Sequence, residues 1–292
     1  MESMRGIGNV FKTGVLLVVL TAFLVLIGMA IGGPRGAVAF FGVSLLLNFS
    51  TYFWSDRIVL SMSGARPVGE ADDPELFAAV RRLAEKANLP MPRLYEIDSD
   101  QPNAFATGRN PSHAAVAVTT GLRRLLGPRE LEGVLAHELS HVRHRDILIA
   151  TIAASIAGAI SYLSHVGLWF GGSRDGDRSP LGGLLFIAVL ILAPIAALLI
   201  QLAISRSREY AADAAGAELA GDAEGLATAL QSLERRARAV PMDVVPATAH
   251  LYIVNPLTAK GFASLFSTHP PTEERVARLR AMAAGQRSEE RS

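Results

Sequence analysis

Four apolar runs divide this chain, and polar segments separate them. The runs are Gly14–Ile31, Ala37–Trp54, Ile147–Phe170 and Leu181–Ile204. Because a helix rises 1.5 Å per residue, the first run extends about 27 Å, close to the thickness of a bilayer's hydrocarbon core. We therefore expect four transmembrane helices in two pairs, with a water-exposed region after each pair.

The first run has an alternative reading as a cleaved signal peptide. It is longer than the usual signal core of about 7–15 apolar residues, and Gly32-Gly33-Pro34-Arg35 follows it in place of a clear small-x-small site. A retained helix is therefore favoured. Pro34 and Gly36 predict a tight turn into the second run, whose aromatic end, Tyr52-Phe53-Trp54, is typical of a membrane interface.

The water-exposed regions carry shorter patterns. Asp73-Pro74 is typical of a helix start, and apolar positions then repeat at helical spacing until Asn88-Leu89-Pro90. Further helices are expected near Ala223–Ala239 and after His269-Pro270-Pro271-Thr272. Three β-prone runs predict a small sheet: Arg93–Asp98, Asn103–Thr107 and Ala114–Thr119.

Composition narrows the class of protein. Half of the residues are hydrophobic and the mean hydropathy is +0.30, which is too apolar for an ordinary soluble domain. The net charge of +1 gives no reason to expect nucleic acid as a partner. The chain has no cysteine, so disulfides and thiolate metal ligands are excluded and His, Asp and Glu remain as ligands.

The strongest chemical signal is the pentad His137-Glu138-Leu139-Ser140-His141. Leucine and valine recur around it at spacings of three and four, which predicts a helix, and we expect this helix to continue into the third apolar run, Ile147–Phe170. Residues four apart on a helix lie one turn above each other, so both imidazoles can reach one metal ion. Glu138, beside the first histidine, would then face a water on that metal.

A catalytic zinc needs a third protein ligand. Two apolar runs lie between His141 and residue 205, so the chain returns to the same side of the membrane. Glu209 and Asp213 are four apart on an expected helix and face the same way. Glu209 is the candidate third ligand, and Asp213 the candidate partner for the outer N–H of a ligand histidine.

A substrate strand and a membrane orientation can also be predicted. Asn103-Ala104-Phe105-Ala106 has small side chains and is a candidate edge strand that holds an extended peptide, although it could merely complete the sheet. Basic residues gather on one side of the four runs, which places both termini and the metal site in the cytoplasm. These residues are Arg5, Lys12, Arg57, Arg66, Arg143, Arg145, Arg206 and Arg208.

With these residues assembled, the chain resembles the HtpX-type bacterial membrane zinc metalloproteases, gluzincins related to the CAAX prenyl endopeptidases. The resemblance rests on the first hairpin, residues 103–106, the pentad, the two later runs, the stretch 205–216 and the ending His269–Thr272. It implies one Zn²⁺ per subunit on His137, His141 and Glu209, with Glu138 as catalytic base. It also implies an inner-membrane enzyme that cleaves misfolded or damaged membrane and cytoplasmic proteins, and itself.

The expected fold is α+β: a mostly α-helical integral membrane protein with four transmembrane helices and a gluzincin-like protease domain containing a small sheet. Residues 1–54 would form the N-terminal hairpin and 55–146 the first part of the protease domain. Residues 147–205 would form the second transmembrane pair, and 206–292 the second part of the protease domain, with the third ligand.

Some functional assignments stay open at this point. His269 is the first candidate for stabilising the oxyanion of peptide hydrolysis, ahead of Arg206 and Tyr210, although it could simply lead into a helix. A membrane zinc carrier or an inactive scaffold is an alternative, but the apolar runs contain almost no polar ligands. A prenylated C-terminal peptide is an alternative substrate, disfavoured because four helices leave little room for an enclosed chamber.

Overall fold

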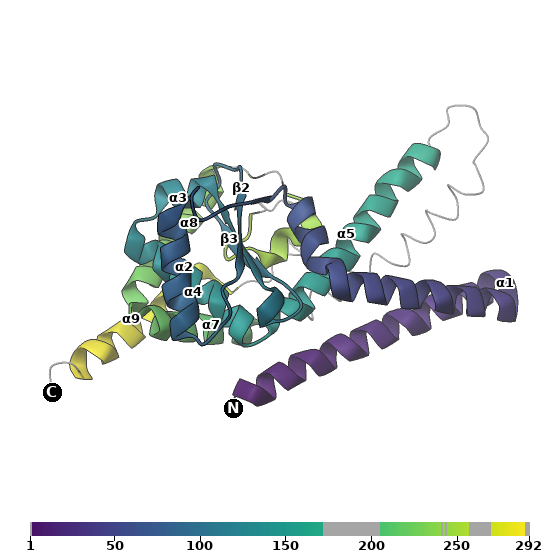
Figure 1. Ribbon diagram of the computed structural model, residues 1–292, viewed down its shortest axis with the longest axis horizontal. Helices are drawn as coiled ribbons and strands as arrows, with labels where there is room; N and C mark the ends of the chain where they lie inside the picture. Colours follow the sequence, from purple (N-terminus) through teal and green to yellow (C-terminus); the bar gives the residue numbers. More distant parts are fainter. Residues whose placement is uncertain (1, 172–204, 241, 243, 257–269, 290–292) are drawn as a thin grey trace.

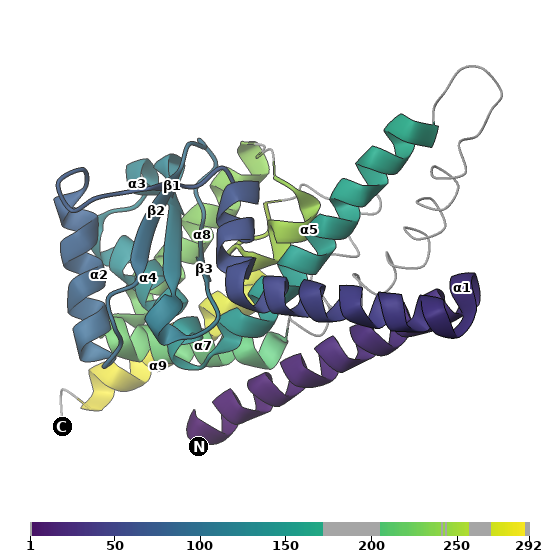
Figure 2. The ribbon, with the colours of Figure 1, turned by 45° about the vertical axis from the view of Figure 1, so that its right-hand side comes forward.

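The computed structural model describes residues 2–171, 205–240, 242, 244–256 and 270–289 (Figure 1). A rounded body of helices packed on a small sheet holds most of these residues. Helices α1 and α5 project from one side of that body (Figure 2). The fourth apolar run, Leu181–Ile204, and His269 lie outside the described residues.

Helix α1 (Glu2–Met62) is a pair of helices joined at Gly32 and Gly33, whose backbone angles are not helical. The predicted hairpin is present, but its turn precedes Pro34 and its second helix continues past Trp54 to Met62. The two helices touch closely, because a Cβ atom on Gly28 would lie 2.4 Å from the carbonyl oxygen of Gly36. A hydrogen bond of 2.8 Å from the Asn48 side-chain amide to the Thr21 hydroxyl also joins them.

Among the described residues, two stretches are long and apolar enough to cross a membrane: Thr13–Ala30 and Gly32–Met62. Large apolar side chains on both are exposed, for example Val18 and Leu46, which suits contact with lipid. The third predicted run forms helix α5 (Asp146–Gly171). Within α5, the stretch Asp146–Gly158 is apolar but shorter than a span.

A four-stranded sheet forms one layer of the body, in the order β1-β2-β4-β3. Strands β2 (Arg93–Ile97), β3 (Ala104–Thr107) and β4 (Ala115–Thr119) confirm the three predicted strands. Strand β2 pairs with β4 in parallel, and β3 pairs with β4 antiparallel at the edge of the sheet. Strand β1 (Arg66–Pro67) has only two residues, too short for a pattern to predict.

Helix α4 (Pro128–Arg143) lies inside the body, where it packs against β3, α5 and the helices formed by residues 74–86, 206–220 and 223–239. The predicted helices near residues 74 and 223 are present as α2 (Pro74–Lys86) and α8 (Ala223–Ala239). The remaining elements are η1 (Pro111–His113), α3 (Thr120–Leu125), α7 (Arg206–Ala220), η2 (Pro246–Leu251) and α9 (Thr272–Glu289). Buried leucines from α2, α4 and α8 fill the space between these helices and the sheet.

The expectation that the pentad helix continues into the third apolar run is wrong. Helix α4 ends at Arg143, and Arg145 adopts a left-handed backbone conformation with φ of 57° before α5 begins at Asp146. A left-handed residue cannot continue an α-helix, so the chain changes direction here. The break places the start of α5 beside the pentad instead of directly beyond it.

Candidate metal centre

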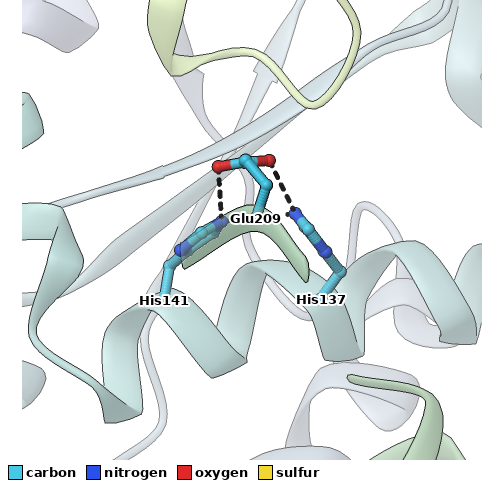
Figure 3. A group of neighbouring side chains, drawn as sticks. All are labelled: His137, His141 and Glu209. Atoms are coloured by element: carbon cyan, nitrogen blue, oxygen red, sulfur yellow. Dashed lines mark hydrogen bonds and ion pairs between the residues drawn. The ribbon is translucent and has the colours of Figure 1, made fainter. Parts of the chain in front are cut away.

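The pentad lies on the buried face of α4. Pro128 stands at the first position of this helix, and the Gly127 N–H donates to the Glu130 carboxylate at 3.0 Å, which fixes the helix start. One turn separates His137 from His141, so their rings stand side by side with centroids 4.8 Å apart. Their Nε2 atoms are 3.2 Å apart and point at a common place (Figure 3).

Helix α7 brings the third candidate ligand to the same place. Glu209 has one carboxylate oxygen 3.8 Å from His137 Nε2 and the other 3.6 Å from His141 Nε2 (Figure 3). The close approach of α7 to α4 needs a small residue at Gly216, where a Cβ atom would lie 2.8 Å from the backbone of His137. The structure therefore brings the three predicted ligands together from two helices.

These three residues fit a metal ion. Ligand atoms bound tetrahedrally at about 2.0–2.2 Å from zinc lie about 3.3–3.6 Å from one another. The two imidazole nitrogens here are 3.2 Å apart, and two different oxygens of Glu209 lie 3.8 Å from His137 and 3.6 Å from His141. With one ligand atom taken from each residue, all three atoms lie within 4.8 Å of one another. Two facing imidazole nitrogens in a buried site are also unfavourable unless a proton or a cation lies between them. The group is the only cluster of potential metal ligands found in the described part of the chain.

Asp213 lies behind His137. Its Oδ1 atom is 3.0 Å from His137 Nδ1, so it stands where a partner for the outer imidazole nitrogen was predicted. Arg275 of α9 donates to both oxygens of Asp213, at 2.8 and 2.6 Å. Burial alone would raise the pKa of Asp213, but the charge and hydrogen bonds of Arg275, together with His137, outweigh it and lower the pKa to about 2.

Asp146 has the matching position behind His141, with Oδ2 at 3.2 Å from Nδ1. It is the first residue of α5, so the break after α4 is what brings it to the histidine. Arg208 approaches the other oxygen of Asp146 at 3.8 Å. Burial would lower the pKa of His141, but Asp146 and Glu209 together raise it to about 9.

Glu138 lies against strand β3 and is 2% exposed. Burial raises the pKa of its carboxyl group to about 8. The charge of His141 and a hydrogen bond from the Ala106 backbone act in the opposite direction. A buried carboxyl group with a pKa near neutrality can both accept and release a proton, which is what a general base requires.

A pocket opens at this centre. Its polar lining includes Glu138, the two histidines and Glu209, and its apolar lining comes from β3, α5, the end of η2 and the residues that follow η2. The apolar lining residues are Ala106, Ile147, Ala150, Leu251, Tyr252 and Ile253. His250, also in the lining, is held by Nε2 at 3.2 Å from the Ala150 carbonyl oxygen.

The other predicted site residues have different surroundings. Residues Ala104–Ala106 of β3 do lie on an edge strand, and Ala106 lines the pocket, but all four residues of β3 are buried. Asn103 is also buried and binds the chain near Val254. Arg206 is exposed, and Tyr210 lies under the Arg278 guanidinium; neither is in the described lining of the pocket. His269 lies outside the described residues.

Sequence reasoning missed Asp146 and Arg275. Asp146 stands five residues after His141, a spacing that places it on another face of a continuous helix, so only the helix break reveals it. Arg275 reaches Asp213 from 62 residues away, and no local pattern marks such a pair. The signal available in the sequence was the position of Arg275, which stands shortly after the predicted start of the last helix.

Comparisons with known proteins found a matching family and several similar proteins. The model of peptidase family M48 matches residues 70–283. Proteins named Protease HtpX homolog from Thermodesulfovibrio yellowstonii and Pelotomaculum thermopropionicum are 55% and 57% identical, and each alignment covers 94% of this chain and 99% of the relative. The Burkholderia mallei homologue is 53% identical over 94% of this chain and 97% of its own length.

The crystal structure of S. mikatae Ste24p aligns with a TM-score of 0.47 and 20% identity, and the alignment covers 95% of this chain. It covers 65% of the Ste24p chain, so the present chain spans less than two thirds of that protein.

Proposed function

The chain belongs to peptidase family M48 and is a metalloendopeptidase, and we propose that its metal is a single Zn²⁺ on His137, His141 and Glu209. The convergence of these three side chains carries the proposal. Two of them come from one helix and the third from another, and all three lie at the pocket. The absence of cysteine leaves nitrogen and oxygen donors, which zinc accepts in catalytic sites.

Glu138 is the proposed catalytic base. A Zn²⁺ bound here would polarise the peptide carbonyl and lower the pKa of a water to about 7. Glu138 would take a proton from the attacking water and pass it to the leaving amine, and its raised pKa favours this return. The Ala106 backbone holds the carboxylate against β3, so its orientation is fixed before the substrate arrives.

Asp146 and Asp213 are proposed to orient the two histidines. Each lies at the outer nitrogen of one ring, which leaves Nε2 of that ring directed at the metal. A carboxylate in this position fixes the tautomer and makes the imidazole a stronger ligand. Arg275 would act on the metal site indirectly, because it holds Asp213 in place and lies 3.9 Å from Glu209.

The substrate class follows from the membrane setting. The protein is a membrane metalloprotease, and we propose that it cleaves misfolded or damaged membrane and cytoplasmic proteins as well as itself. Strand β3 beside Glu138 would hold an extended peptide through main-chain contacts, which suits a protease that reads little sequence. The end of α1 and the start of α5 pack against β3 and the residues beside it, so the bilayer would lie near the pocket.

The full membrane topology is also a proposal. It has four transmembrane helices in the inner membrane, with the protease domain and both termini in the cytoplasm. The two spans of α1 and the apolar start of α5 support it. The distribution of basic residues supports the orientation.

The test is a Glu138→Gln variant of the full chain, purified in detergent. It is expected to retain one zinc per chain and to lose cleavage of an unfolded protein and of itself. A chelator should abolish the same cleavage in the original chain, and added zinc should restore it. Equal cleavage by Glu138→Gln and the original chain would remove the mechanism.

Two other functions would give different results in the same test. A zinc carrier or inactive scaffold would bind zinc and show no cleavage in any variant. An enzyme restricted to prenylated peptides would cleave a prenylated C-terminal peptide and leave the unfolded protein intact.

A further inference from the structure

We propose that Leu251–Val254, here called the strap, occupies the place of a substrate on β3 and must move away before a peptide can bind. The inference rests on the proposed proteolytic function and adds a closed state to it. Four sets of contacts between the strap, β3 and the metal centre carry it.

One edge of β3 is not paired with another strand of the described sheet, and that edge faces the strap. On its other side β3 pairs with β4, where Asn103 accepts a hydrogen bond of 3.0 Å from the Thr119 N–H. Main-chain groups alternate along a strand, so Ala104 and Ala106 direct theirs away from β4. Ala106 bonds to Glu138 on that side. The free edge therefore leads directly to the proposed catalytic base.

The strap uses the bonds that an extended substrate would use. The Ile253 N–H donates to the Ala104 carbonyl at 3.0 Å. The Asn103 side chain binds both main-chain groups of Val254, donating to its carbonyl at 2.7 Å and accepting from its N–H at 3.3 Å. All of these contacts involve the strap's backbone, so a peptide of almost any sequence could replace them.

The strap also covers the centre. Leu251, Tyr252 and Ile253 line the same pocket as Glu138 and the histidines. His137 is only 1% exposed, and the Tyr252 ring rests edge-on against Phe105 with centroids 5.0 Å apart. A substrate strand would have to lie about 4.8 Å from β3, where the strap now lies. Strap and substrate therefore exclude each other at Ala104.

Arg275 links the strap to the metal centre. One of its nitrogens donates to the Ile253 carbonyl at 3.0 Å, while two others hold Asp213. Departure of the strap would free one N–H of Arg275 and leave the pair with Asp213 intact. The closed and open states are thus expected to bind zinc alike and to differ in peptide access.

A disulfide lock tests this proposal, because the chain has no cysteine of its own. The bond between Ile253 and Ala104 keeps their Cα atoms within about 7 Å, at the limit that a disulfide spans. The double variant Ala104→Cys, Ile253→Cys is oxidised, checked by intact mass, and assayed with unfolded casein before and after reduction by a phosphine. The two single-cysteine variants receive the same treatment as controls.

The oxidised double variant is expected to cleave at least tenfold more slowly than the same protein after reduction, with equal zinc content. The single variants should not respond to reduction. Equal rates in the oxidised and reduced forms, with the disulfide shown to be present, would overturn the proposal.

Hydrogen exchange gives a second, independent measurement if the disulfide does not form. In Glu138→Gln, saturating oxidised insulin B chain is expected to increase amide exchange over residues 251–254, since the peptide displaces the strap. Unchanged or slower exchange there would overturn the proposal. Absence of cleavage by the zinc-loaded original chain would instead count against the proposed function, and the exchange measurement would still decide on the strap.

Discussion

His137 and His141 stand one turn apart on α4, yet the charged side chains behind their outer nitrogens are buried to different extents. Behind His137 lie Asp213 and Arg275, whose side chains are 5% and 1% exposed. Behind His141 lie Asp146 and Arg208, whose side chains are 10% and 15% exposed. Each of these two supports joins three helices: α4, α7 and α9 meet behind His137, and α4, α5 and α7 meet behind His141.

This difference in burial indicates which of the two supports contributes more to the stability of the fold. A buried carboxylate and a buried guanidinium each need the other, because removal of one leaves an unpaired charge in a medium of low polarity. The pair behind His141 is less buried and its charged atoms are 3.8 Å apart, compared with 2.6 Å for Arg275 and Asp213, so its loss should be better tolerated. We therefore expect the His137 side to affect both stability and metal binding, and the His141 side to affect mainly metal binding.

The largest effect is expected where the two supports meet. Glu209 lies opposite both histidines, and Glu209→Gln keeps its shape but removes its charge. Cleavage and zinc retention should both be lost, as measured by metal analysis and casein degradation. A variant that keeps full zinc and full cleavage would show that Glu209 is not a ligand.

Loss of the deep arginine should come next. Arg275→Met leaves the Asp213 carboxylate buried without its partner and should lower the free energy of unfolding by about 3–5 kcal/mol. The matched control is Arg278→Met on the same helix, whose pair with Glu274 and contact with Tyr210 are exposed and should contribute far less. Denaturation in detergent measures both, and similar losses would contradict the contrast between the two supports.

The two aspartates give the direct comparison. Asp213→Asn and Asp146→Asn should each weaken zinc binding by about 10–100-fold, since each removes a negative charge from a ligand histidine. The loss should be greater for Asp213, because Arg275 then keeps an unbalanced buried charge. Competition with a chelator of known affinity measures this. A greater loss in Asp146→Asn would reverse the proposed order of the two supports.

The smallest change tests the spacing of the helices. A methyl group at Gly216 would press on the His137 backbone and separate α7 from α4, with a destabilisation of about 1–3 kcal/mol. Zinc affinity should fall with it. Gly285→Ala is the control, because nothing lies within 4 Å of its new Cβ and alanine favours a helix by up to about 1 kcal/mol. Unchanged stability in Gly216→Ala would contradict the close approach.

Local patterns predicted the elements that local forces determine. Asp73 does cap α2, accepting from the Leu76 N–H at 3.0 Å, and the predicted range Ala223–Ala239 is the range of α8. The pentad predicted the two histidines on one face, because four-residue spacing fixes that geometry in any helix. Counting the apolar runs predicted that Glu209 returns to the same side, and its distances in the structure agree with that prediction.

Features that depend on distant contacts could not be predicted. Neither glycine nor proline marks the helix break at Arg145, so the apolar pattern predicted one continuous helix. The position of Asp146 beside His141 could not be predicted from that pattern. The cover over β3 comes from main-chain groups of Ile253 and Val254, which any residues would supply. The edge position of β3 was therefore predictable from its composition, whereas its burial was not.

X-ray absorption at the zinc edge tests the central claim most directly, because it counts the imidazoles on the metal of the intact chain. We predict two imidazole nitrogens, with oxygen donors completing the shell at about 2.0–2.2 Å, and loss of the zinc signal in Glu209→Gln. Three imidazoles, or a Glu209→Gln spectrum identical to that of the original chain, would contradict a centre built from His137, His141 and Glu209.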